Sequence, residues 1–218
     1  MKLVGMRLIR ISWKIVGILV ISVISLTACG GSATIDAATL LTEKEISSTS
    51  TLEPFLPAMS LDEQLHESCA EPRKLLGLIA ETNKVAQSEY SLSDGSLFLI
   101  QQYIFEAKSE DEAVNLVANL RTIPSDKTCF SEGRKANDAY DLQGSFDTSL
   151  TGIAWNGSYY SRSEFFGNVL EIQLDDLKVF ATKGSYIYAL FLSTEPASEI
   201  TKADFNAIAK KALAKFAG

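Results

Sequence analysis

The chain contains few side chains that can carry out chemistry, and their types limit the reactions open to it. His66 is the only histidine, so any nucleophile–histidine–acid arrangement has to use it. It stands between Glu63 and Glu67 in a charged segment, where an exposed or capping histidine is far more common than a catalyst. The sequence has no Gly-x-Ser-x-Gly elbow, phosphate-binding loop, dinucleotide fingerprint or zinc motif. We therefore expect no catalytic residue, no metal and no cofactor.

Two short polar stretches could form sites but are better explained as turns. Asp175 and Asp176 are adjacent carboxylates that suit a calcium site or an acid–base pair, but the spacing of an EF-hand is absent. Acidic residues between two strand patterns are typical of a turn. Asn156-Gly157-Ser158 is formally a glycosylation sequon, and next to Trp155 it also predicts a turn.

The amino-terminal segment has the layout of an export signal. Its first fourteen residues contain Lys2, Arg7, Arg10 and Lys14 and no acid, and residues 15–28 carry no charge. A basic region followed by an apolar region is typical of a secretory signal. A membrane-spanning helix needs about 20 apolar residues, whereas the uncharged run turns small and polar after residue 26. A cleaved signal is therefore favoured over a permanent span.

Leu26-Thr27-Ala28-Cys29 at the end of this segment resembles the lipobox of bacterial lipoproteins. The resemblance implies that the Cys29 sulfur receives a diacylglyceryl group and that a signal peptidase removes residues 1–28. It also implies that the new amino terminus is open to acylation, and two or more acyl chains hold a protein stably at a membrane. We expect a lipoprotein anchored through Cys29 on the extracytoplasmic face of the cell membrane.

The remaining two cysteines, Cys69 and Cys129, are an even pair in a chain predicted to be exported. Disulfides persist outside the cytoplasm, so this pair predicts a disulfide. Two free thiols or a metal site remain open as alternatives, although no second Cys or His stands at ligand spacing beside either residue.

Charge and composition exclude one class of partner and divide the chain. The whole chain has a formal net charge of −7, and removing the four basic residues of the signal leaves −11. Such an acidic domain is not expected to bind nucleic acid. Residues 29–53 are rich in Ser, Thr, Ala and Gly, which predicts a flexible tether after the lipidated cysteine. Residues 54–218 are long enough for a single domain with its own core.

Hydrophobic periodicity predicts three helices in this domain. Capping signals precede each of them, at Ser60–Glu63, Ser109–Glu112 and Thr201–Asp204. We expect Pro72 to end the first helix and Pro124 the second. The third buries Phe205, Ile208, Ala209, Ala212 and Phe216, and carries its lysines toward its carboxyl end.

Between the helices the period changes to two, which indicates strands. The expected strands are 85–92, 97–107, 158–166, 169–174, 177–182 and 186–193, and Asp94-Gly95, Gly167-Asn168 and Gly184-Ser185 are the expected turns. The prediction is an α+β fold, in which an antiparallel sheet of about five to six strands packs in layers against two to three amphipathic helices.

The lipobox, the order of helices and strands and the two cysteines together resemble the actinobacterial PknH-like sensor-domain lipoproteins, from about residue 54 to residue 217. The resemblance implies an antiparallel sheet between helices and a cleft for a small ligand. Those domains usually contain two disulfides, whereas here only Cys69 and Cys129 are available for that role.

Aromatic residues concentrate in the carboxyl-terminal strands. Strand alternation sends some of them to each face of the sheet, and most are expected to be core residues. A minority could line an apolar pocket; the candidate ligand-binding residues are Trp155, Tyr160, Tyr186 and Tyr188.

Three functions are compatible with these features of the sequence. The leading hypothesis is a membrane-anchored extracytoplasmic module, not an enzyme, that binds or senses a small-molecule ligand. The alternative is a cell-envelope lipid carrier, which needs an apolar cavity of several hundred cubic ångströms. A hydrolase that uses His66 is the third.

The disulfide gives a direct test of the domain prediction. Replacing Cys69 or Cys129 by Ser should lower the free energy of unfolding by about 2–5 kcal/mol, as in other small secreted domains. Mass spectrometry of non-reduced, alkylated protein should find a linked peptide pair containing both residues. Alkylation of both thiols in unfolded, never-reduced protein would contradict the prediction.

Overall fold

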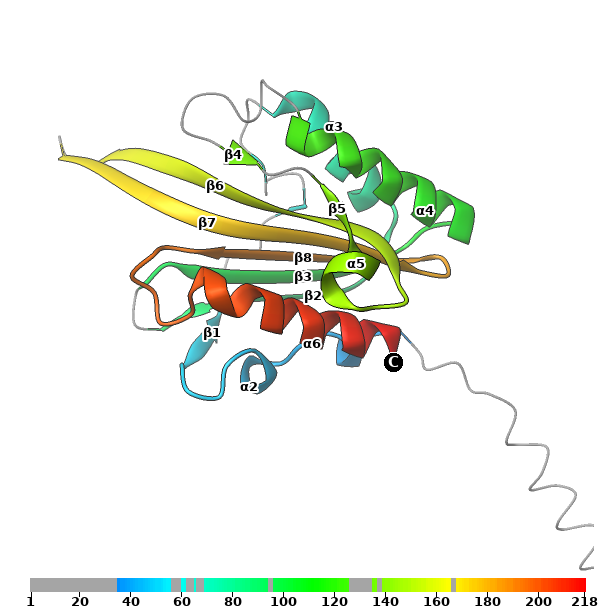
Figure 1. The fold of residues 1–218 in the computed structure, drawn as a ribbon, viewed down its shortest axis with the longest axis horizontal. Coiled ribbons are helices and arrows are strands. Elements are labelled where there is room, and N and C mark those ends of the chain that lie inside the picture. The colour runs from blue at the N-terminus through cyan, green and yellow to red at the C-terminus, as the bar shows by residue number, and fades with distance from the viewer. Residues whose placement is uncertain are drawn as a thin grey trace, which may run out of the picture. The chain divides into compact units, whose positions relative to one another are not determined.

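An antiparallel sheet with helices on both faces forms the framework of the protein (Figure 1). The computed structural model describes residues 35–55, 60–61, 65, 69–93, 96–125, 135–136, 139–165 and 168–218, without the side chains of 135–136, 159–165 and 168–172. The described helices are η1 (Ala37–Thr39), α2 (Glu43–Ile46), α3 (Ala70–Ala80), α4 (Glu110–Asn119), η3 (Leu120–Ser125), α5 (Leu142–Phe146), η4 (Lys202–Asp204) and α6 (Phe205–Ala217). The described strands are β1 (Leu52–Pro54), β2 (Asn83–Leu92), β3 (Phe98–Glu106), β4 (Lys135–Ala136), β5 (Tyr140–Asp141), β6 (Thr151–Phe165), β7 (Asn168–Lys183) and β8 (Tyr186–Thr194).

The strands of the described residues form one sheet in the order β1-β2-β3-β8-β7-β6-β4, with β5 also paired to β6. Every pairing is antiparallel. This confirms the predicted α+β class with an antiparallel sheet. The described sheet has eight strands, more than the five to six expected. The strands missed are β1, β4 and β5, which have only two or three residues and are too short to show an alternating pattern.

Side chains from the two faces of the sheet enter two separate apolar clusters. We call one the α6 face, because its residues pack with α6, and the other the α4 face, because its residues pack with α3 and α4. On the α6 face the strands contribute Ile100, Ile104, Leu177, Val179, Tyr188, Leu190 and Leu192. On the α4 face they contribute Tyr103, Phe105, Ile153, Trp155, Phe180, Ile187, Ala189 and Phe191.

Two of the predicted helices form where their caps indicate. Ser109 accepts a hydrogen bond from the Glu112 N–H (3.2 Å), and α4 follows with three acids in its first turn, where negative charge suits the helix dipole. The Glu112 side chain caps the Lys108 N–H instead of closing the expected box. Before α6, the Thr201 N–H donates to Asp204 (2.9 Å).

The first predicted helix differs from the structure. Pro72 was expected to end a helix that starts at Ser60, but it lies in the first turn of α3, which begins at Ala70. A first-turn N–H has no acceptor within its own helix, so a proline costs little there. Residues 62–64 and 66–68 of the predicted helix, including His66, lie outside the described residues.

The predicted turns at Asp175–Asp176 and Asn156–Ser158 are wrong. The strand β7 runs unbroken through both acids, and Asp176 pairs with Gly157 of β6 on one side and with Ser193 of β8 on the other. A residue bonded to strands on both sides cannot turn, whatever its intrinsic preference. The turn at Gly184–Ser185 is confirmed, with Gly184 in the left-handed region at φ 56°. The turns at residues 94–95 and 167 fall outside the described residues.

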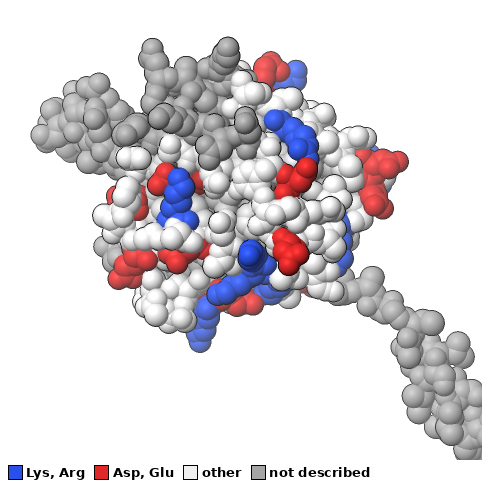
Figure 2. Space-filling view, in the orientation of Figure 1, with Lys and Arg blue, Asp and Glu red and all other residues white. Residues whose placement is uncertain are grey.

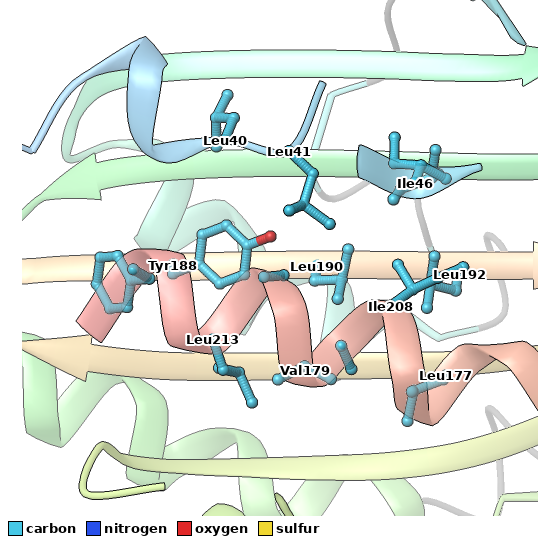
Figure 3. Packing of buried hydrophobic residues seen from close by; sticks show 14 of the residues in the cluster. Leu40, Leu41, Ile46, Leu177, Val179, Tyr188, Leu190, Leu192, Ile208 and Leu213 are labelled. Carbon is cyan, nitrogen blue, oxygen red and sulfur yellow. The ribbon is translucent and has the colours of Figure 1, made fainter. Parts of the chain in front are cut away.

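The predicted tether of residues 29–53 also differs from the structure over its second part. The folded unit begins at Ile35, and the segment 35–52, which we call the strap, lies on the α6 face. Its residues Ile35, Leu40, Leu41, Ile46 and Leu52 are buried. Figure 3 shows Leu40, Leu41 and Ile46 near β2 and β3, and the α6 residues Ile208 and Leu213 over β8 and β7 on the same face of the sheet. Residues 1–34, with the predicted signal and Cys29, lie outside the described residues.

A buried side chain from the centre of the sheet holds the strap in place. The Gln102 Oε1 accepts from the Leu41 N–H (2.9 Å), and the Gln102 Nε2 donates to the Leu41 carbonyl (3.0 Å). The same amide accepts from the Tyr188 hydroxyl and donates to Ser88. Gln102 thus gives Leu41 both bonds that a neighbouring strand would give.

Ion pairing joins the strap to α6. The Lys215 Nζ donates to the Leu40 carbonyl (2.7 Å) and to the Glu45 carboxylate (2.8 Å). The Lys211 Nζ donates to the Glu45 carbonyl (3.1 Å). The hydrogen bond from Lys215 to the Glu45 carboxylate, followed by the one from the Thr42 N–H, lowers the pKa of Glu45 to about 2.

Charged groups elsewhere on the surface are mixed in sign. On the described part of the face in Figure 2, acidic and basic side chains are interspersed and do not gather into areas of one charge. Exposed ion pairs include Arg121 with Asp141 and Lys202 with Asp175.

The Glu45–Lys215 pair predicts a pH-dependent contribution to stability. Because the folded-state pKa is about 2, against an ordinary value of 4.5, the contribution is present above about pH 4.5 and is lost as the pH falls toward 2. Glu45→Gln should lower the free energy of unfolding at pH 7 by less than about 1 kcal/mol, because exposed pairs are screened by solvent. Urea unfolding should show this difference shrinking in acid. Glu43→Gln, in the same helix, is the control; a Glu45→Gln deficit that is constant from pH 7 to pH 2 would contradict the argument.

Candidate functional site

A row of side chains on the α4 face mixes charged, amide and aromatic groups. Register pairs Gln101 with Phe191, Phe191 with Lys178, and Lys178 with Trp155. Glu89 of β2 pairs with Gln101. Directly opposed residues on neighbouring strands share a face, so the row crosses β2, β3, β8, β7 and β6. Each of the five residues is at most 7% exposed, so the polar members need partners inside the protein.

Asp176 and Lys178 form an ion pair within this face. They are two residues apart on β7, and their side chains are 6% and 8% exposed. The Lys178 ammonium contacts the Asp176 Oδ2. Burial lowers the pKa of Lys178 to about 7, because a charged form is disfavoured away from water.

The second oxygen of Asp176 is a buried acceptor without a donor. Among the described residues, Asp176 Oδ1 is the buried side-chain atom for which the structure gives no hydrogen-bond partner. Leaving a buried acceptor unsatisfied costs about 1–3 kcal/mol, and more for a charged group. A group with this cost is a candidate for a functional role.

Gly157 provides the space that the Asp176 carboxylate occupies. The two residues are opposite each other in register, and a Cβ on Gly157 would lie 2.0 Å from Asp176 Oδ1. Any other residue at position 157 would displace the carboxylate. This contact gives a physical reason for a glycine inside a strand, where glycine otherwise weakens the structure.

Glu89, at the β2 end of the row, has several hydrogen-bond partners. The Tyr103 hydroxyl (2.8 Å) and the Gln87 Nε2 (2.5 Å) donate to Glu89 Oε1, and the Gln101 Nε2 donates to Glu89 Oε2 (3.2 Å). Both carboxylate oxygens of Glu89 are therefore satisfied. The contrast with Asp176 places the open hydrogen-bonding capacity at the β6–β7 end of the row.

The aromatic residues predicted as ligand candidates do not gather in one place. Trp155 lies on the α4 face and stacks on Phe180, with ring centroids 5.6 Å apart. Tyr188 lies on the opposite face, stacks on Phe216 at 5.3 Å and has a pKa raised by burial. Tyr186 packs against the cluster of that face and has a pKa raised chiefly by the charge of Glu106. The side chain of Tyr160 lies outside the described residues, so Trp155 is the candidate that remains beside the buried pair.

The other sequence candidates are separated from this site or outside the described residues. Asp175 pairs with Lys202 at 3.1 Å, and its neighbour Asp176 points to the other face of β7, so the two acids do not share a site. Within the described residues, no group of three or more metal-ligating side chains is close enough to hold an ion. Cys69 is buried at the amino end of α3; Cys129 lies outside the described residues, and their pairing stays a prediction.

Sequence reasoning missed Lys178 and Gly157 because it split β7 at the two acids and began β6 only at Ser158, after a predicted turn. A signal was present: Lys178 interrupts the apolar run 177–181 at an inward position, and glycine interrupts a strand pattern at position 157.

Comparison with known proteins gives one finding on the fold. A scan against models of protein families gives no match, and a search of curated proteins gives none. Among solved structures, the chain is similar to the extracellular domain of PknH from Mycobacterium tuberculosis, with 12% sequence identity and a TM-score of 0.48. The alignment covers 83% of this chain and 94% of that one. At this level the likeness carries no inference about ligand or partner.

The contact between Gly157 and Asp176 predicts a specific loss of stability. Gly157→Ala should lower the free energy of unfolding by about 1–3 kcal/mol, the usual effect of overpacking, because the carboxylate has to move. The loss should be smaller when Asp176 is already Ala, which urea unfolding of the double mutant would show. Gly77→Ala is the control: a Cβ there meets nothing within 4 Å, so it should be neutral or stabilising. Equal losses in both Asp176 backgrounds would refute the contact.

Proposed function

We propose that this protein is a lipid-anchored extracytoplasmic module that binds a small ligand on the α4 face and catalyses no reaction. The binding site is the region of Asp176, Lys178 and Gly157, with Trp155 beside it. The anchor is the lipidated Cys29.

One observation carries the binding site: Asp176 Oδ1 is buried and has no hydrogen-bond donor among the described residues. The surrounding structure holds the carboxylate there, since Gly157 leaves room for it and Lys178 binds its other oxygen. A ligand that donates to Oδ1 would recover the free energy that the unliganded protein lacks. The buried pair therefore favours binding as its role.

The sequence supports binding over catalysis. His66, the only histidine, has no motif around it that activates a nucleophile. The buried Asp–Lys pair occupies a strand interior whose neighbours Trp155 and Phe191 are aromatic. Such surroundings suit recognition of a ligand, as in most sites where a few polar groups stand among apolar ones.

A polar ligand also fits this site better than the acyl chain of a lipid. An acyl chain against Asp176 and Lys178 would leave Oδ1 without a donor and bury the ion pair further. Apolar side chains of the described residues are gathered into two buried clusters, one on each face. We therefore do not propose the lipid-carrier alternative.

The anchor places the domain close to the membrane. Five residues separate Cys29 from Ile35, where the folded unit begins, and so short a stretch spans at most about 20 Å. No helix among the described residues is long and apolar enough to cross a membrane.

Metabolic labelling tests the anchor. Cys29→Ala should abolish incorporation of labelled fatty acid and leave unprocessed precursor, while Cys69→Ala should still be labelled. Labelled Cys29→Ala protein would refute the anchor and leave the ligand site untouched.

Native mass spectrometry tests binding. Protein extracted from its own membranes should carry a small polar ligand, and Asp176→Asn should carry it at strongly reduced occupancy. Asp175→Asn is the matched control, because Asp175 pairs with Lys202 outside the site. Wild-type protein that never carries a ligand, or equal occupancy in both variants, would overturn the proposed site; a co-purified lipid would favour the carrier.

A further inference from the structure

We infer that the ligand of the Asp176–Lys178 site is a neutral molecule that presents an amide or hydroxyl group to the ion pair. The inference rests on the proposed function and adds the chemical class of the ligand. It follows from the charge of the pair, its open donors and acceptors, and its neighbours.

The charge of the site favours a neutral ligand. Asp176 and Lys178 carry opposite charges and are in contact, so the pair is close to neutral as a unit. Both side chains are less than a tenth exposed, and a net charge buried there without a partner would lose its hydration. An anion would compete with Asp176 for Lys178, and a cation would compete with Lys178 for Asp176. A neutral ligand leaves the pair intact.

The open hydrogen-bonding groups require a donor and an acceptor on the same ligand. Asp176 Oδ1 accepts only, and it lacks a donor among the described residues. An ammonium group has three donors, and the described part of the structure shows one contact of Lys178 Nζ, with Asp176 Oδ2. A primary amide offers an N–H next to a carbonyl, and a hydroxyl group offers both functions on one atom. Either group can bridge Oδ1 and Nζ without a proton transfer.

The neighbouring side chains suit a flat or compact ligand. Trp155 and Phe191 flank Lys178 in register on β6 and β8, and both are almost fully buried. An amide plane or the C–H face of a hydroxylated ring packs well against an aromatic ring. The site is closed in this structure, so binding has to displace side chains that cover it.

Three molecules of similar shape and different charge test whether the site prefers a neutral ligand. Acetamide, acetate and acetamidinium differ in charge and in donors but hardly in size. The probe experiment titrates each into the ¹⁵N-labelled chain, purified from membranes in detergent micelles at pH 6, and follows the backbone amide signals of Gly157, Asp176 and Lys178. Acetamide should shift these signals, with an affinity at least about tenfold above that of either ion. A higher affinity for acetate or acetamidinium, or no shift with any of the three, would overturn the inference.

Two variants change the relative affinities of the two ions. Asp176→Asn removes the anion of the pair, so acetamidinium should lose affinity relative to acetate. Lys178→Met removes the cation, so acetate should lose affinity relative to acetamidinium. Asp175→Asn should keep the wild-type order. If Asp176→Asn or Lys178→Met unfolds the protein, the amide spectra will show it. The order of probe affinities in the wild-type protein then tests the inference by itself.

The outcomes separate this inference from the proposed function. A ligand found by native mass spectrometry together with a charged preference in the titration would refute the ligand class and keep the binding function. Acetamide binding at Asp176 without any co-purified ligand would keep the chemistry of the site and refute its proposed use.

Discussion

Burial of both faces of the central strands β3, β8 and β7 is the constraint on which the rest of the structure depends. Strands of a sheet with one solvent-exposed face alternate apolar and polar residues, whereas these strands are buried on both faces and have to be apolar at nearly every position. The run Tyr186–Thr194 of β8 meets this requirement almost without interruption. Each polar side chain in such a strand loses water and needs a partner within the protein. The helices α4 and α6, the strap and the buried polar groups are all consequences of covering two faces instead of one.

The buried polar groups meet this requirement in different ways. Gln102 on the α6 face bonds to the strap, to Ser88 and to Tyr188, so it fixes a segment that lies outside the sheet. Glu89 on the α4 face is satisfied by side chains of its own and the adjacent strand. Asp176 is bonded through one oxygen only. The hydrogen bonds of Gln102 and Glu89 explain their burial, and Asp176 is the buried group for which we propose a ligand.

Local sequence signals predicted those elements whose cause is local. The caps at Ser109 and Thr201 and the apolar stripe of α6 placed two helices, because capping and periodicity act within a few residues. Distant contacts decided the rest. The strap has the composition of a Ser/Thr-rich linker, but its buried apolar residues and its bonds to Gln102 and Lys215 make it part of the fold. The adjacent acids at 175–176 predict a turn from sequence alone, but pairing with β6 and β8 keeps these residues extended. The site was missed for the same reason, since Gly157 and Asp176 meet only through strand register.

The strap also sets the order in which the molecule can be completed. Leu41 bonds to a residue 61 positions later, and Leu40 to one 175 positions later. The strap precedes both partners in the chain, so the bonds of Leu41 and Leu40 cannot form until residues 102 and 215 are present. The sheet can assemble in the meantime, but the layer over its α6 face closes only when residues 205–217 arrive. A chain that lacks residues 205–217 would therefore leave β7 and β8 uncovered on the α6 face (Figure 3).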